Sequence, residues 1–94
     1  MMKLPVYYNK LNYTQRRVVR EQYIQEQKGE CYWCRKPLNG DPHKDVMSKR
    51  VNFKLFPPNF QQHPIHLQHD HNTGLTEGAV HMRCNAVMWQ YHSK

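Results

Sequence analysis

The chain has 94 residues, which allows one small domain and leaves no room for a second hydrophobic core. Hydrophobic residues make up 38% of it, enough for a modest core and too many for a disordered chain. A domain of this size buries a limited apolar area, so we expect a staple such as a metal or a disulfide. The formal net charge of +7 favours a polyanionic partner. Nucleic acid ranks above an anionic membrane because no lipid-binding helix or membrane span stands out, and a merely soluble basic protein is the alternative.

The cysteines and the first residues bear on the cellular compartment. Three cysteines cannot close a disulfide framework, and two of them stand in a Cys-x-x-Cys pair typical of metal ligands. This usage indicates a reducing, intracellular setting. The first residues lack the apolar core of a signal peptide, so we expect a soluble protein that is not secreted.

The first third of the chain is expected to hold an extended arm and one long helix. Residues 1–11 are predicted to be extended, because Pro5 disfavours helix and aromatic and β-branched residues follow it. The helix is expected over residues 12–28, with Asn12 or Thr14 as its N-cap. With Asn12 in that role, Gln15 takes the capping-box position.

The middle of the chain, residues 38–64, is rich in proline and is predicted to be mostly loop. Within it, residues 50–55 alternate polar and apolar side chains, which favours a short half-buried strand. Arg50 and Lys54 would lie on its polar face. Such a face is more often simply solvated than bound to a partner.

The last third is predicted to form a hairpin and a helix. A strand is expected from Ile65 to about His69, a turn at Thr73–Gly74 and a short strand around residues 79–81. A helix follows over residues 83–91. Its packing stripe is expected to consist of Val87, Met88 and Tyr91.

Two ligand pairs point to a structural metal site. Cys31-x-x-Cys34 and His81-x-x-Cys84 supply three sulfurs and one imidazole, the set that zinc binds in a tetrahedron. Joining the two pairs would close a long loop and add folding energy that a small core lacks. A thioredoxin-like redox role for the cysteine pair is the weaker alternative, because no βαβ pattern surrounds it.

The remaining histidines divide into two groups. His43, His63 and His92 are interpreted as ordinary surface or hydrogen-bonded residues. The cluster of His66, His69 and His71 is harder to explain in that way. A neutral imidazole has a pKa close to neutrality, which suits it to take a proton from water.

The motif from His69 to Gly74, followed by Gly78 and by the segment from His81 to Asn85, resembles the HNH (ββα-metal, or His-Me finger) nucleases. Within them it is most similar to the phage recombination endonucleases and free-standing phage homing endonucleases. The resemblance covers residues 31 to about 91. It implies an α+β fold: a zinc-stapled ββα-metal core over residues 31–94, preceded by an added arm and basic helix over residues 1–30, in a single compact domain.

The resemblance also implies roles for particular residues. His69 matches the general base that activates water, Asn85 an amide ligand of the catalytic Mg²⁺ or Mn²⁺, and His71 a phosphate-contacting or auxiliary histidine. Cys31, Cys34, His81 and Cys84 match the structural Zn²⁺ ligands. The implied products carry 5′-phosphate and 3′-hydroxyl ends, and the implied location is the host cytoplasm if the gene belongs to a phage.

One departure from the family pattern is Gln68, which stands where relatives carry an Asp or His ligand of the catalytic ion. Its amide oxygen lacks the charge that favours Mg²⁺. Weaker metal binding, a preference for Mn²⁺, help from His66 or Asp70, and loss of cutting remain open.

A set of basic residues is predicted to contact DNA phosphates, whether the DNA is duplex or branched. For the arginines at the start of the first helix, a solvated face with pairs such as Arg17–Glu21 is an equal alternative. The alternatives to a nuclease are a DNA-binding or regulatory module that has lost cutting and a zinc module that contacts protein. The oligomeric state, monomer or homodimer, is left open. The predicted phosphate contacts are Arg16, Arg17, Arg20, Lys49, Arg50, Lys54 and Arg83.

Overall fold

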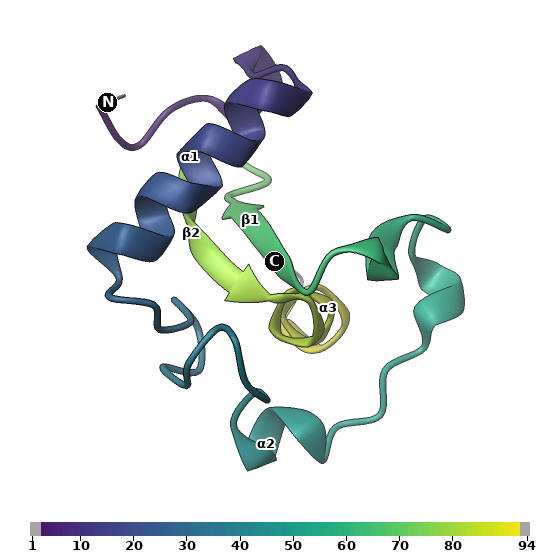
Figure 1. Cartoon of the computed structure of the whole chain (residues 1–94). Helices are drawn as coiled ribbons and strands as arrows, with labels where there is room; N and C mark the ends of the chain where they lie inside the picture. The colour runs from purple at the N-terminus through teal and green to yellow at the C-terminus, as the bar shows by residue number, and fades with distance from the viewer. Residues whose placement is uncertain (1–2, 93–94) are drawn as a thin grey trace.

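The structure, a computed structural model, describes residues 3–92. Two helices flank a two-stranded hairpin, and Figure 1 shows α1 on one side of it and α3, viewed along its axis, on the other. The segment between residues 40 and 64 runs as an outer loop around α3 before it returns to the hairpin (Figure 1). The elements in chain order are η1 (Tyr8–Lys10), α1 (Tyr13–Glu26), α2 (Lys44–Met47), η2 (Phe53–Leu55), η3 (Phe60–Gln62), β1 (Ile65–His69), β2 (Thr76–His81) and α3 (Met82–His92).

The start of α1 agrees with the sequence prediction. Asn12 is the N-cap, its side chain accepts a hydrogen bond from the backbone N–H of Gln15, and the Gln15 side chain accepts from the N–H of Asn12. These reciprocal bonds satisfy two backbone donors that the first turn leaves without intrahelical partners. The helix ends at Glu26, two residues before the expected end at residue 28. Lys28 and Gly29 follow with positive φ values of 57° and 79°.

The hairpin is antiparallel, with Ile65 paired to His81 and Gln68 paired to Gly78. The next pair joins His69 to Thr76, which leaves Glu77 as an extra residue on β2. A bulge of this kind bends the strand and changes the direction of the adjacent side chains. The irregularity therefore lies directly beside His69, at the end of β1.

The turn between the strands is held by Asp70. Its carboxylate accepts hydrogen bonds from the backbone N–H groups of Asn72 at 2.7 Å and Thr73 at 3.0 Å. Gly74 adopts a φ of +81°, a conformation that glycine reaches at little cost, and its N–H donates to the Asp70 carbonyl at 2.7 Å. The predicted turn at Thr73–Gly74 is confirmed.

The outer edge of β2 is covered by the end of α1. The side-chain amide of Gln27 accepts from the N–H of Ala79 at 2.8 Å and donates to its carbonyl at 2.9 Å. Gly78 lies against this contact, where a Cβ atom would come within 2.7 Å of the Gln27 Oε1 and 2.9 Å of the Tyr32 Cβ. A side chain at position 78 would therefore displace the amide that joins α1 to the hairpin.

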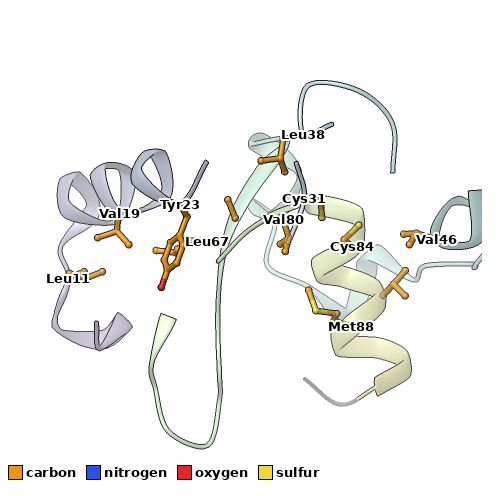
Figure 2. Close-up of a cluster of buried hydrophobic side chains, with 12 residues drawn as sticks. Leu11, Val19, Tyr23, Cys31, Leu38, Val46, Leu67, Val80, Cys84 and Met88 are labelled. Atoms are coloured by element: carbon orange, nitrogen blue, oxygen red, sulfur yellow. The ribbon is translucent and has the colours of Figure 1, made fainter. Parts of the chain in front are cut away.

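The hydrophobic core is continuous across the expected boundary at residue 30. Figure 2 shows Val19 and Tyr23 of α1 directed toward Leu67 of β1, and Cys84 and Met88 on α3 within the same cluster. Val19, Cys84 and Met88 are at most 1% exposed. The arm and α1 thus pack with the hairpin and α3 in one core, and the α+β class expected from the sequence is confirmed.

Several details differ from the sequence prediction. Residues 50–55 do not form a strand, because neither of the two strands in the described part of the chain pairs with them. Instead, Asn52 caps the short 3₁₀ helix η2. The helix α2 was not anticipated. Tyr91 was placed in the packing stripe of the last helix, but it is 46% exposed and its hydroxyl donates to the Arg50 carbonyl at 2.6 Å. Among the described residues, no helix is long and apolar enough to cross a membrane.

Candidate metal centre and basic groove

Four side chains from three parts of the chain meet at one point. Cys31 and Cys34 lie on a turn after α1, His81 ends β2 and Cys84 lies in the first turn of α3, and their ligand atoms are all within 4.8 Å of one another. The predicted convergence of these residues is confirmed. Because α3 begins directly after β2, the end of the strand and the first turn of the helix place His81 and Cys84 on the side that faces Cys31 and Cys34.

The tautomer of His81 is set by a hydrogen bond outside the cluster. Its Nε2 lies 2.8 Å from the Pro37 carbonyl oxygen, which can only accept, so Nε2 carries the proton. The lone pair of Nδ1 then faces the sulfurs of Cys34 at 3.5 Å and Cys84 at 3.6 Å. A backbone carbonyl on the distal nitrogen is the usual way in which a metal-binding histidine is oriented.

One sulfur of the cluster, that of Cys31, favours the charged thiolate. The three cysteines are free of disulfides, and a hydrogen bond from Cys84 lowers the pKa of the Cys31 thiol to about 4. The same hydrogen bond, together with burial, raises the pKa of Cys84. Cys31 and Cys84 thus share a proton, and a metal cation bound by the four side chains would take the place of that proton. Three sulfurs and one imidazole within this distance could hold a metal ion such as zinc. The described residues define a small α+β protein with a Cys₃His group that could hold a metal ion.

A groove of about 320 Å³ lies between α1 and β1. Its basic wall comes from α1, which places three arginines there, and its opposite wall comes from β1 and from the loop before it. None of the described residues that line it is Asp or Glu. The lining residues are Tyr8, Tyr13, Arg16, Arg17, Arg20, Pro57, Asn59, Phe60, His63, Ile65, His66, Leu67, Gln68, His69, His71 and Asn85.

His69 is the best-placed proton acceptor in this groove. Burial lowers its pKa below the ordinary value, and the nearby His71 and Arg16 lower it further. Its ring stacks on Tyr8 with centroids 4.0 Å apart and planes 10° from parallel. The His71 ring meets it edge-on at 4.7 Å. His69 is therefore a neutral, oriented base at neutral pH.

Asn85 reaches the groove from α3 and contacts His66, not His69. The Nε2 of His66 donates to the Phe60 carbonyl at 2.9 Å, so its Nδ1 accepts from the Asn85 Nδ2 at 3.0 Å. This bond leaves the Asn85 Oδ1 as the atom available to a ligand. Burial lowers the pKa of His66, which keeps the ring neutral and able to accept.

Gln68 is 2% exposed, and its amide nitrogen is already engaged. The Nε2 donates to the His69 carbonyl at 3.0 Å and to the Glu77 carboxylate at 3.4 Å. Asp70, considered as a substitute ligand, forms the turn instead. Within residues 3–92, the Cys₃His group is the only cluster of three or more His, Cys, Asp or Glu side chains arranged to hold a metal.

The other predicted phosphate contacts lie away from the groove. Lys49, Arg50, Lys54 and Arg83 do not line it. The Arg83 guanidinium donates to the carbonyls of Met47 at 3.4 Å and Lys49 at 2.7 Å, so it joins α3 to the end of α2. Tyr8 and Phe60 also line the groove. The motif gave no signal for them, because both lie outside it.

The comparisons with known proteins add no family to these observations. No family model matches the chain, and searches of curated proteins and of solved structures found no match.

Proposed function

We propose that this protein is a DNA endonuclease of the HNH type, which hydrolyses phosphodiester bonds in the groove between α1 and β1. The observation that carries the proposal is the position of His69, a neutral and half-buried imidazole in a groove that has an arginine wall and no acidic lining residue. An acid-free basic groove attracts a polyanion, and a neutral histidine inside it can activate water.

In the proposed reaction, His69 accepts a proton from the water that attacks phosphorus. The arginines Arg16, Arg17 and Arg20 hold the backbone phosphates of the bound strand. His71, edge-on to His69, is placed to contact a phosphate oxygen. The P–O3′ bond breaks, and the 3′ oxygen takes a proton from solvent water, so the products carry 5′-phosphate and 3′-hydroxyl ends.

A divalent ion, Mg²⁺ or Mn²⁺, is part of the proposal, and the groove matches it only in part. Its amide oxygens, from Asn85 and Gln68, are neutral, and no carboxylate lines the groove. Mg²⁺ is usually held by one or two carboxylates together with substrate phosphates, so these donors fit the ion only once a DNA phosphate supplies the charge. When bound, the ion would act as a Lewis acid on the phosphate.

The Cys₃His group would hold a structural zinc ion in this proposal. Cys84 lies one residue before Asn85, so a metal at the cluster would fix the first turn of α3 and with it the Asn85 side chain. The cluster is built from ligands on three separate segments, and all four positions are taken by protein atoms. Such a closed set is typical of a structural site.

Conversion of supercoiled plasmid to nicked circles tests the proposal. The wild-type protein, loaded with zinc, is incubated with Mg²⁺ or Mn²⁺ beside the His69→Ala variant and an EDTA control. We expect the wild-type protein to form nicked circles, because a single active site cuts one strand at a time. The His69→Ala variant and the EDTA control should leave the plasmid supercoiled. Equal activity of the two proteins would contradict the proposal. Linear and four-way-junction substrates then separate duplex from branched preference.

A second candidate is a DNA-binding module on the same fold that no longer cuts. The neutral residue at position 68 and the acid-free groove favour it, because the protein offers a catalytic ion no charge of its own. This candidate predicts DNA binding without cleavage and a gain of cleavage in Gln68→His. Gln68→Asp is the poorer test, since the new carboxylate would be buried beside Glu77 unless Glu77→Gln accompanies it.

A further inference from the structure

The N-terminal arm packs on the end of the hairpin and brings one aromatic side chain into the groove. The N–H of Tyr8 donates to the Gly74 carbonyl at 2.8 Å, and the N–H of Thr76 donates to the Val6 carbonyl at 2.8 Å. Tyr7 forms an isolated bridge with Leu75. These backbone bonds fix the arm independently of its side chains. The Tyr8 ring is therefore held over His69 by the main chain around it.

Tyr8 has charged and neutral partners on its two faces. The His69 ring lies parallel to it at 4.0 Å, and the guanidinium carbon of Arg16 lies 4.2 Å from the ring centroid. Both groups cannot occupy the same face of one ring at these distances, so the tyrosine separates them. The Tyr8 side chain thus sets the positions of the His69 imidazole and of the Arg16 guanidinium.

Arg16 differs from Arg17 in having no carboxylate partner among the described residues. Arg17, on the same helix, forms an ion pair with Glu21 at 3.7 Å. Within residues 3–92, Arg16 has no such ion pair, and its buried Nε has no hydrogen-bond partner. The Nε of Arg83 is in the same state, but the Arg83 guanidinium bonds two carbonyls. The Arg16 guanidinium has no carboxylate partner, and no acidic residue lines the groove around it. It is therefore available to bind an anion from another molecule.

We propose that Tyr8 is a positioning residue of the active site, which holds His69 and Arg16 on its two faces, and that Arg16 binds a phosphate of the strand being cut. The proposal rests on the proposed nuclease function and adds the arm to its machinery. The stack limits rotation of the imidazole and of the guanidinium before DNA arrives. Reacting groups that are oriented in advance lose less entropy on reaching the transition state.

The kinetic test uses two variants of Tyr8 in the zinc-loaded full chain. Tyr8→Leu keeps apolar bulk and removes both aromatic faces, whereas Tyr8→Phe keeps the ring. We expect Tyr8→Leu to lower kcat about 100-fold with a smaller change in KM, the size that a misplaced reacting group produces. Tyr8→Phe should keep a kcat close to that of the wild-type protein. An unaffected kcat in Tyr8→Leu, or equal losses in both variants, would overturn the proposal.

The binding test does not depend on cleavage. Affinity for a short labelled duplex is measured in EDTA, after zinc loading, by fluorescence anisotropy for Arg16→Lys and for Arg17→Lys. Arg17 is a second groove arginine, but its guanidinium is already paired with Glu21 and should contribute less to phosphate binding. Lysine keeps the charge but loses the planar fork. We expect Arg16→Lys to lose about ten times more affinity than Arg17→Lys, the size of one charge-assisted contact. Equal losses would overturn the role of Arg16, whether or not the wild-type protein cuts DNA.

A spectroscopic measurement separates positioning from simple folding. In the wild-type protein, the ring protons of His69 should be shifted upfield by the parallel tyrosine, and the shift should persist in Tyr8→Phe and vanish in Tyr8→Leu. Thermal unfolding and zinc content of each variant are recorded beside it. If the His69 ring protons of the wild-type protein are not shifted upfield, the two rings do not stack and the proposal is overturned. Absence of cleavage together with a shifted His69 and the expected Arg16 effect would instead contradict only the nuclease function.

Discussion

Asn85 of α3 donates a hydrogen bond to Nδ1 of His66 on β1, with 3.0 Å between the two nitrogens. The bond joins the helix to the hairpin between two residues that line the groove, and the Phe60 carbonyl on Nε2 fixes the tautomer that allows it. It orients the Asn85 amide with its oxygen available. His66 therefore acts as a structural support of the proposed site, and its lone pair is already in use.

Replacing His66 should weaken both the fold and the site. In His66→Leu the Phe60 carbonyl and the Asn85 amide lose their partner, and a lost hydrogen bond at a buried group costs about 1–3 kcal/mol. Chemical denaturation monitored by circular dichroism measures the change. An exposed site such as His92→Leu serves as control and should change stability by less than about 0.5 kcal/mol. Equal values for the two variants would show that the His66 contacts contribute nothing.

Stability should fall on acidification because of His66. Burial lowers its folded-state pKa below the ordinary value of about 6.5, so below that pH the unfolded chain binds more protons than the folded one. The free energy of unfolding should thus decline as pH drops from about 6.5 toward the folded-state pKa. His66→Leu should show a shallower decline in the same window. Parallel pH profiles for the two proteins would contradict this assignment.

The Cys₃His group should contain one zinc ion per chain. Metal analysis of the purified protein measures it, and Cys84→Ser should abolish stoichiometric zinc and lower the melting temperature sharply. His43→Ala, at a histidine outside the cluster, should retain zinc. A strong chelator should unfold the wild-type protein, because binding energy at such a site is folding energy. A fully folded, active, zinc-free protein would exclude the structural role.

The pH dependence of cleavage should report His69. Its pKa is lowered by burial first and then by His71 and Arg16, so the neutral base persists below pH 6.5. We expect log kcat/KM to rise with pH along an acid limb whose midpoint lies below about 6.5, and to be flat near neutrality. The measurement is made at constant ionic strength, because salt alone alters DNA binding. A midpoint above about 6.5 would exclude the lowered pKa of this base.

The parts of the fold that the sequence predicts are those set by local chemistry or by ligand spacing. Asn12 and Gln15 cap α1 through bonds three residues apart, and the Asp70 turn closes within five residues. The Cys₃His group was predictable from the spacing of two ligand pairs, which no other interpretation explains well. Each of these signals is contained in a short stretch of chain.

The parts that escaped prediction depend on contacts between distant segments. Tyr8 reaches His69 only because the arm bonds the hairpin turn near residue 74, and Asn85 meets His66 across the hairpin–helix junction. The alternation over residues 50–55 indicated a strand, but a strand also needs a partner, and none is adjacent. The same limit explains why the bonds from Arg83 to the carbonyls of Met47 and Lys49 were not foreseen.

The most direct test of the central claim is the single-turnover cleavage rate of a labelled DNA duplex, with Mn²⁺ or Mg²⁺, for the wild-type protein and for His69→Ala. Both proteins must first show equal zinc content and equal DNA affinity in EDTA. We predict that His69→Ala cuts about 10²- to 10⁴-fold more slowly, the contribution expected of a general base. Equal rates for the two proteins, or no cleavage by the wild-type protein with either ion, would contradict the account.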